Sequence, residues 1–561
     1  MESKRLLLAT ILSIAIILGY QAIAARFFPP PEPAPGGRAA PSPAASVAPS
    51  AGDAATATTG PAPGAAPVAA APAPAVPQGE RVTVRTEQYE MVFSTATAGP
   101  VEVRLPDYRA SKEPGAPPVA LADLAEGALV PTLLVPGGQR LLPPGTLYTV
   151  EPAGGLVLEP GQEGTLTFTA EAPGGVRVVN RYIFEAAPQY AFRLEQTVTN
   201  SGGQPVGVQA AWVLRHARDV EAERAAGYSS GALVRSVAGV RREDFEDVGQ
   251  GFRVPGPVDW AGWQEKYFAG VVLPRGPQVE AVVVGEQPAG SAVTGGAPQS
   301  GAATGPVGVV QVVYQAAQVA PGGSVTASAG QIYMGPKDVG ELRKVDPRLE
   351  QVIHLGFFHW IAMPLLLTLR WLHGILGNYG LAIIALTILI KLVFWPLTAK
   401  QIRSSKAMAR IQPEMTRLRE KYKNDREALN REMMQLFRKH NVNPLMGCLP
   451  LLVQIPVFFA LYQVLSQSIE LRHAPFAGWI QDLSAMDPYY ATPILMGVSM
   501  FVTQRMTPMP GMDPTQQKLM LIMPAMMSVF FLWMPSGLVL YWLVMNVLQI
   551  AQQAYANRIS A

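Results

Sequence analysis

The sequence is poor in the residues that hold metals, disulfides and redox centres. Among its 561 residues there are six histidines and one cysteine, Cys448, which lies in an apolar stretch. A lone cysteine excludes an intrachain disulfide framework, a cysteine-based zinc site and a redox pair. The ligands that a haem, an iron–sulfur cluster or another metal centre requires are also in short supply. We therefore expect no cofactor.

Charged residues are also few, and neither sign dominates. Only 15% of the residues are charged and the net charge is +3, which is too small to indicate direct nucleic-acid binding. Hydrophobic residues make up 49% of a chain that is longer than one ordinary domain. This combination predicts a membrane part joined to a soluble part.

The amino-terminal segment resembles a membrane anchor. A short basic start precedes the apolar run Leu6–Ala25, whose length matches the ~20 residues of a spanning helix. We predict a transmembrane anchor over residues 1–27, with its amino end in the cytoplasm. The small residues Ala22-Ile23-Ala24 leave a cleaved signal peptide as the alternative. Residues 28–79 are rich in alanine and proline and are predicted to form a disordered linker.

Short runs of alternating polarity fill residues 80–345. Gly164–Phe168 and Tyr190–Leu194 are examples, and glycine or proline separates successive runs. This pattern is typical of an all-β sandwich. The segment is long enough for a domain with its own core.

The same segment offers no recognisable catalytic set. His216 and the nearby Asp219, Glu221 and Glu223 could act as acids or bases, but they lack the spacing of a known motif. A solvated loop is the preferred interpretation. Aromatic residues at 260–268 are expected to pack in a core or between domains rather than to bind sugar; they are Trp260, Trp263, Tyr267 and Phe268.

Residues 378–398 form the most informative apolar run. The run is long enough to span a bilayer, yet Lys391 lies well inside it and Thr387 lies one helical turn earlier. A lysine at mid-membrane depth costs roughly 2.5–3.5 kcal/mol, so it usually faces protein or water. Residues four apart share a helix face. Lys391 therefore either marks a functional polar face or extends its ammonium to the lipid headgroups.

The neighbouring segments predict how this run crosses the membrane. Residues 346–377 are apolar but are interrupted by proline, histidine and arginine, so we predict an amphipathic helix at the outer interface. Residues 399–443 are strongly basic, which places them in the cytoplasm. Two helices, the second capped by Asn424 and Glu427, are expected to form a hairpin there. Its basic surface can meet anionic lipid, a ribosome or an emerging chain; the residues selected for it are Arg403, Lys406, Arg410, Arg417 and Arg419.

Residues 444–561 contain four further apolar stretches. Two of them are shorter than a relaxed bilayer requires and are expected to thin the membrane locally. Together with the anchor and the central run, they complete six predicted spans. Both termini then lie in the cytoplasm and the β-rich domain lies outside it.

Several long strings carry a resemblance to a known family. They are NYGLAIIALTILIKLVFWPLT, MGCLPLLVQIPVFFALYQVL, ELRHAPFAGWIQDLSAMDPYY, DPTQQK and FFLWMPSGLVLYW, in that order along the chain. The string IYMGPK, at residues 332–337, is similar to the end of the same family's periplasmic domain. The chain therefore resembles the YidC family of bacterial membrane protein insertases, in its long form with a periplasmic domain.

This resemblance implies a fold and a site. The periplasmic domain would be a β-supersandwich similar to that of sugar mutarotases, without their activity, and five helices would enclose a hydrophilic groove. Lys391 corresponds to the groove cation, where many relatives carry arginine. Thr387, Gln454 and Tyr541 match groove-lining or nearby polar positions, and Trp542 stands where relatives often have tyrosine.

The implied function is insertion without covalent chemistry. An insertase and chaperone of this kind moves nascent transmembrane segments from the cytoplasm into the inner membrane, alone or with the Sec translocon. The implied partners are nascent membrane proteins, membrane lipids and the Sec translocon. The ribosome is a further candidate, and no direct contact with nucleic acid is expected.

The residues by themselves leave two other classes of protein open. A transporter that uses Lys391 would require inverted repeats or paired broken helices, and the sequence displays neither. An enzyme that uses the β-rich domain would require an acid–base pair there. Deletion of residues 81–330 would abolish the function of such an enzyme, whereas an insertase should largely tolerate it.

Overall fold

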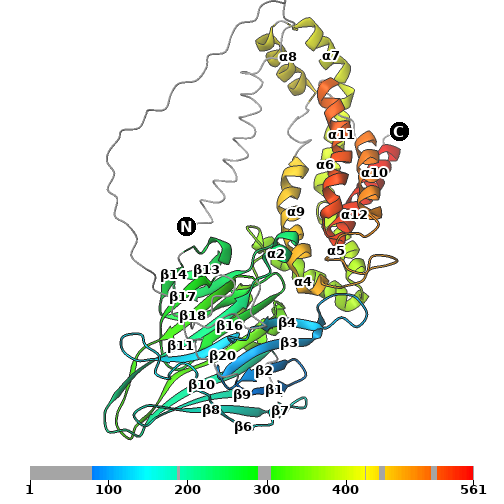
Figure 1. The fold of residues 1–561 in the computed structure, drawn as a ribbon. Coiled ribbons are helices and arrows are strands. Elements are labelled where there is room, and N and C mark those ends of the chain that lie inside the picture. Colours follow the sequence, from blue (N-terminus) through cyan, green and yellow to red (C-terminus); the bar gives the residue numbers. More distant parts are fainter. Residues whose placement is uncertain are drawn as a thin grey trace, which may run out of the picture. The chain divides into compact units, whose positions relative to one another are not determined.

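The computed structural model describes residues 79–185, 190–249, 251–287, 305–423, 425–440, 449–506 and 514–559. They form a β-rich part from Arg81 to Pro336 and a helical part from Val339 to Ile559 (Figure 1). The predicted anchor and almost all of the predicted linker lie outside the described residues, as do Asn424 and Cys448.

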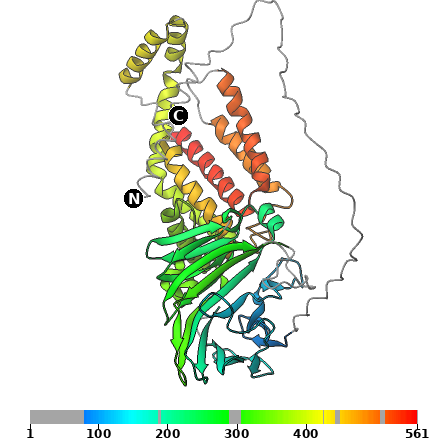
Figure 2. The same cartoon turned by 60° about the vertical axis from the view of Figure 1, so that its left-hand side comes forward.

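The β-rich part contains three sheets, which Figure 2 shows as curved layers. In sheet order, the first is β4 (Pro118–Asp123), β3 (Gly99–Arg109), β2 (Glu90–Ser94), β1 (Arg81–Arg85) and β7 (Leu156–Val157). The second is β13 (Gly239–Asp244), β12 (Gly231–Ser236), β15 (Val258–Gln264), β16 (Phe268–Pro274), β20 (Ser324–Pro336), β10 (Ala191–Asn200), β9 (Val176–Phe184), β8 (Gly164–Ala172) and β6 (Thr149–Glu151). The third is β14 (Phe252–Pro255), β17 (Val279–Gln287), β18 (Val307–Tyr314), β11 (Val206–Ala217) and β19 (Ala317–Val319), with β5 (Leu129–Leu134) also paired to β11.

Alternating side chains build the core of this part. Along β9, every second residue from Val176 to Phe184 is buried, as the period of a half-buried strand requires. Strands β11 and β18 pack against β15. Phe93, Phe168 and Tyr182 meet in this core, with ring centroids 4.9–5.9 Å apart. The predicted β-rich domain is therefore confirmed.

The helical part begins with α3 (Val339–Val345) and the 3₁₀ turn η2 (Pro347–Val352). Its longer helices are α4 (His359–Leu376), α5 (Tyr379–Val393), α6 (Trp395–Arg410), α7 (Gln412–Lys421), α8 (Arg426–Lys439), α9 (Leu449–Gln467), α10 (Ala491–Met506), α11 (Pro514–Phe530) and α12 (Ser536–Ile559). The turns η4 (Ile469–Leu471) and η5 (Phe531–Trp533) follow α9 and α11, while α2 (Val220–Ala225) and η1 (Phe245–Asp247) lie within the β-rich part. Helix α4 occupies only the second half of the segment 346–377, for which a single helix was expected.

The central apolar run is broken rather than straight, so the prediction of one continuous helix over 378–398 is wrong. Helix α5 ends at Val393 and α6 begins at Trp395 with a proline in its first turn. Pro396 has no backbone N–H, so it cannot continue the α5 hydrogen-bond ladder. By length and apolar composition no single described helix could cross a membrane, but α5 and α6 together could, with a bend of 62° between them.

Helices α7 and α8 pack on each other around a small core of their own. Ile411, Met415 and Leu436 are its buried residues. The predicted helix cap is wrong by one residue, because the Asp425 side chain accepts the hydrogen bond from the Ala428 N–H. Asp425 provides the same type of cap as the expected asparagine.

Polar contacts join the two parts of the chain. Arg472, in the loop after η4, donates to the Arg109 carbonyl oxygen at 2.6 Å. On α4, Arg370 forms an ion pair at 3.2 Å with Asp338, which lies between the two parts, and a second at 3.3 Å with Glu470 of the helical part itself. The β-rich part is therefore attached to the helices by more than the connecting chain.

Candidate functional site

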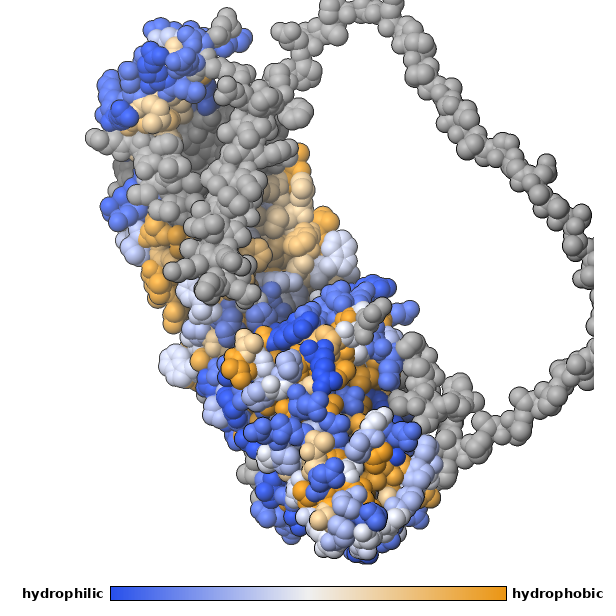
Figure 3. Space-filling view, turned by 90° about the vertical axis from the view of Figure 1, so that its left-hand side faces the viewer, coloured by the Kyte–Doolittle hydropathy of each residue, from blue (hydrophilic) through white to orange (hydrophobic). Residues whose placement is uncertain are grey.

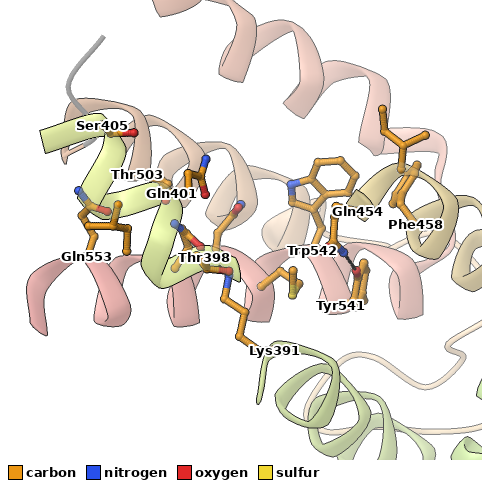
Figure 4. A pocket seen from close by; sticks show the side chains of 15 residues that line it. Lys391, Thr398, Gln401, Ser405, Gln454, Phe458, Thr503, Tyr541, Trp542 and Gln553 are labelled. Atoms are coloured by element: carbon orange, nitrogen blue, oxygen red, sulfur yellow. Dashed lines mark hydrogen bonds between the residues drawn. The ribbon is translucent and has the colours of Figure 1, made fainter. Parts of the chain in front are cut away.

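A cavity of about 390 Å³ lies among α5, α6, α9, α10 and α12 (Figure 4). Its lining combines one cation with amides, hydroxyls and large apolar side chains. The apolar residues of the lining are Ile402, Ile455, Phe458, Trp542 and Met545. Of the described residues that line it, none is acidic. The cavity can therefore offer hydrogen bonds and a positive charge next to apolar surface.

Lys391 supplies the cation. Its side chain extends from the last turn of α5 into the cavity, where Nζ donates to the Gln549 Oε1 of α12 at 2.5 Å. The side chain is half-buried. An uncharged amide does not neutralise the lysine that it holds, because its oxygen accepts a hydrogen bond without supplying a counter-charge.

Three more of the predicted groove residues line the same cavity. The Gln454 Nε2 of α9 donates to the Tyr541 Oη of α12 at 2.9 Å. The Trp542 ring packs edge-to-face on Phe458 and Phe531, with centroids 4.7 and 5.1 Å away. These contacts bring α9, η5 and α12 together at one end of the cavity.

Thr387 lies elsewhere. It is fully buried, and its Oγ1 donates to the Ile383 carbonyl oxygen of its own helix at 2.6 Å. It is absent from the described residues that line the cavity. The spacing of four residues aligned Thr387 with Lys391, but the long lysine side chain reaches a space that the short threonine side chain does not.

Other polar residues of the cavity did not emerge from the sequence. Asn546, Gln549 and Gln553 follow Trp542 at intervals of four, three and four residues along α12. That spacing places them on one face of a helix that is otherwise largely apolar, so a search for polar stripes would have found them. Thr398, Gln401 and Ser405 of α6, with Thr503 of α10, complete the polar lining.

The predicted basic residues are divided between α6 and α7. Arg403, Arg410, Arg417 and Arg419 have exposed side chains. Lys406 is half-buried, and its Nζ donates to the Ala556 carbonyl oxygen of α12 at 2.6 Å. In the space-filling view of Figure 3, hydrophilic residues cover the end of the helical part that carries α7 and α8.

The β-rich part shows that the solvated-loop interpretation of His216 is wrong. His216 is buried on β11 and stacks on Trp263, with ring centroids 4.3 Å apart. Glu223 is also buried and pairs with Arg218 at 2.7 Å. Asp219 caps α2 by accepting from the Ala222 N–H at 3.0 Å. The apolar neighbours of His216 come from other strands, so the local sequence did not reveal its burial.

The predicted packing role of the aromatic segment is confirmed. Trp260, Trp263 and Phe268 are buried in the core. Tyr267 lies nearer to the helical part, with the Arg472 guanidinium 5.9 Å from the centre of its ring.

His216 makes stability dependent on pH. Burial lowers the pKa of His216 from 6.5 to about 4. Between those values the unfolded chain binds a proton that the folded chain does not, so stability is unaffected above pH 6.5 and falls as the pH drops toward 4. Between pH 7.5 and pH 5, we expect the wild type to lose about 2 kcal/mol more stability than His216→Gln. Denaturant titrations of both proteins at the two pH values measure this difference. Equal losses of stability would contradict the lowered pKa of His216.

Comparison with known proteins covers the whole chain. The family model described as "60Kd inner membrane protein" matches residues 371–561, and the one described as "YidC periplasmic domain" matches residues 81–368. The "Membrane protein insertase YidC" of Geobacter metallireducens is 39% identical and covers 99% of this chain and 98% of its own length. The protein of that name from Syntrophus aciditrophicus is 36% identical and covers 99% of both chains.

Solved structures match less closely. The structure titled "Active YidC insertase crystal structure with the first transmembrane domain resolved" is 17% identical, covers 84% of this chain and 94% of its own, and has a TM-score of 0.36. A galactose mutarotase-like protein from Lactobacillus casei is 7% identical, covers 46% of this chain and 100% of its own, and has a TM-score of 0.30.

Proposed function

Because the chain belongs to the YidC family of membrane protein insertases, we propose that nascent transmembrane segments enter the inner membrane by way of the cavity around Lys391. The polar flank of a segment would occupy the cavity briefly while its apolar stretch moves into lipid. The observation that carries this proposal is the combination of an uncompensated cation, amides and apolar side chains in one cavity.

The polar flank is the part of a substrate that hydrocarbon disfavours. An unpaired polar group in hydrocarbon costs several kcal/mol. Gln454, Gln401 and Asn546 line the cavity with amides that can replace part of the lost hydration. Phe458 and Trp542 provide apolar surface for the adjoining hydrophobic stretch. A substrate would therefore find both kinds of surroundings within one space.

Lys391 would determine which substrate flanks the cavity stabilises most. An ammonium in a partly dehydrated cavity attracts carboxylates more strongly than one in water does. Lysine keeps the charge of the arginine found in many relatives but lacks its planar, bidentate fork. We therefore expect attraction to acidic flanks in general rather than a fixed pairing geometry.

The proposed topology has six spans, with both termini in the cytoplasm. The basic residues of α6 and α7 support a cytoplasmic location for that segment, and the β-rich part would then be periplasmic. Exposed apolar side chains on α10 and α11 support contact with lipid; they are Ile494, Leu495, Val498, Leu521, Ile522 and Met526. Exposed tryptophans on α4, Trp360 and Trp371, suit an outer interface.

Partners are proposed on the same grounds. The exposed arginines of α6 and α7 can bind anionic lipid headgroups or approach a ribosome and the chain that emerges from it. Insertion by this protein alone or together with the Sec translocon is proposed.

Photocrosslinking tests the proposed path. A photoreactive residue would replace Gln454 or Trp542, which line the cavity, and a stalled ribosome would present a short membrane-protein segment. We expect crosslinks to the segment from both positions, and their loss when its hydrophobic stretch is removed.

Controls on α5 and α10, two other helices that contribute to the cavity, make that result specific. Thr387 is buried outside the cavity lining, while Leu389 and Val498 have exposed side chains on α5 and α10. Efficient insertion with crosslinks only from these control positions would contradict the cavity as the substrate path.

A further inference from the structure

Gln549 holds the Lys391 ammonium in place. The bond from Lys391 Nζ to Gln549 Oε1 is 2.5 Å long and joins residues 158 positions apart in the chain. It connects α5 to α12 across the cavity that both residues line. A hydrogen bond to a charged group is among the stronger ones in proteins.

The neighbouring cavity amides have other partners. Gln454 donates to Tyr541 at 2.9 Å, and Asn546 donates to the Ser499 hydroxyl at 3.0 Å. Gln553, one turn beyond Gln549, donates to the Met506 carbonyl oxygen at 3.4 Å. Of these four described amides, Gln549 is the one that contacts the cation.

Lysine needs such a partner more than arginine would. Its four-carbon stem is flexible, and a free ammonium near a membrane surface extends toward water and headgroups. Lys391 lies in the last turn of α5, next to exposed Leu392 and Val393. The bond to Gln549 keeps the ammonium directed into the cavity instead.

The neutrality of the acceptor matters as much as its position. The amide oxygen of Gln549 accepts a hydrogen bond from one N–H of the ammonium, which leaves two donors and the whole charge for another ligand. A carboxylate at the same place would hold the ammonium equally well but would neutralise it. Glutamine therefore orients the cation without neutralising it.

We propose that Gln549 is a positioning residue, which holds Lys391 as an available cation in the cavity and thereby sets a preference for acidic over neutral substrate flanks. This inference rests on the proposed function, because it requires the substrate flank to meet Lys391. It predicts that changes at Gln549 alter the discrimination between flanks and act only through Lys391.

The test uses the full-length protein in liposomes and two reporter segments. Their translocated flanks carry either two aspartates or two asparagines and are otherwise identical. The measured quantity is the ratio of the initial insertion rates of the acidic and the neutral reporter. This ratio cancels general losses of activity or folding, which affect both reporters alike.

Substitutions at Gln549 should lower the ratio. Gln549→Leu removes the acceptor and is expected to reduce the ratio ~5-fold, in line with the net contribution of one typical hydrogen bond. Gln549→Glu, which is nearly isosteric, should bring the ratio close to one because its carboxylate neutralises Lys391. Gln552→Leu, a matched change on the same helix at a residue outside the described cavity lining, should leave the ratio at the wild-type value.

A double substitution separates positioning from a structural role. In a Lys391→Met background, Gln549→Leu should cause no further change in the ratio or in the rate for the neutral reporter. A further loss there would assign Gln549 to general packing and overturn the inference. An unchanged ratio in both Gln549 variants, with the ratio lost in Lys391→Met, would also overturn it while leaving the proposed function intact. A wild-type ratio in Lys391→Met would instead refute the role of Lys391 and, with it, both proposals.

Discussion

Replacing Lys391 with methionine is expected to reduce the insertion of a segment with an acidic flank about tenfold or more, since hydrogen bonds to charged groups contribute roughly 1.5–3 kcal/mol. Methionine fills a similar volume but offers neither a donor nor a charge. Of the described residues that line the cavity, Lys391 is the only charged one, so no neighbour can replace it. The initial rate of insertion into liposomes that contain the purified protein measures the effect.

Charge-preserving and distant substitutions provide the controls. Lys391→Arg should retain most of the activity because it keeps the cation. Lys421→Met removes a lysine from exposed α7 and should have no comparable effect. Equal insertion of the acidic segment by Lys391→Met and Lys421→Met would show that the Lys391 ammonium has no part in the substrate path. The alternative from the sequence, in which the ammonium extends to the lipid headgroups, would then be preferred.

Replacing Arg218 with methionine is expected to destabilise the β-rich part by about 3–5 kcal/mol, the range for breaking a buried ion pair. The Arg218 side chain is only 2% exposed, pairs with Glu223 at 2.7 Å and also contacts Glu286. Its Nε donates to the Ser230 hydroxyl at 3.1 Å. Without the guanidinium, the buried Glu223 carboxylate loses its counter-charge.

Denaturant unfolding followed by tryptophan emission measures this loss, because Trp212, Trp260 and Trp263 are fully buried in the same part of the chain. Arg177→Met serves as the matched control. Arg177 pairs with Glu171 at 3.2 Å, but both side chains are more than half exposed, so its removal should cost no more than about 1 kcal/mol. Equal midpoints for the Arg218 and Arg177 variants would show that the buried pair does not stabilise the domain.

The insertion rate of the Arg218 variant carries separate information. The residues of the cavity all belong to α5, α6, α9, α10 and α12. A weakened β-rich part should therefore leave insertion largely unchanged under conditions where the helices remain folded. This expectation agrees with the tolerance of the 81–330 deletion expected for an insertase.

The local pattern of apolar and polar residues was sufficient to predict whether a segment is helical or β-stranded. Strands such as β9 alternate between buried and partly exposed residues along their length, and that alternation is written directly in the sequence. The same holds for the apolar helices and for the unusual position of Lys391. The long strings shared with the family identified the protein before any contact between segments was known.

Pattern was insufficient wherever the partner of a residue comes from a distant part of the chain. His216 was assigned to a solvated loop because it and the nearby acidic residues lack the spacing of a known motif, whereas Trp263 from another strand stacks on it. The break after Val393 was also missed, although Pro396 provided a signal for it. The prediction of one long helix followed the apolar composition of the run and did not take this single proline into account.

The sequence by itself thus determined the family, the division into β-rich and helical parts, and four of the five residues selected for the cavity: Lys391, Gln454, Tyr541 and Trp542. Only the tertiary structure decided that Thr387 lies outside the lining and that Gln549 meets the lysine. The physical reason is that periodicity specifies which face of a helix is polar, whereas the packing of α5 against α12 determines which polar faces meet.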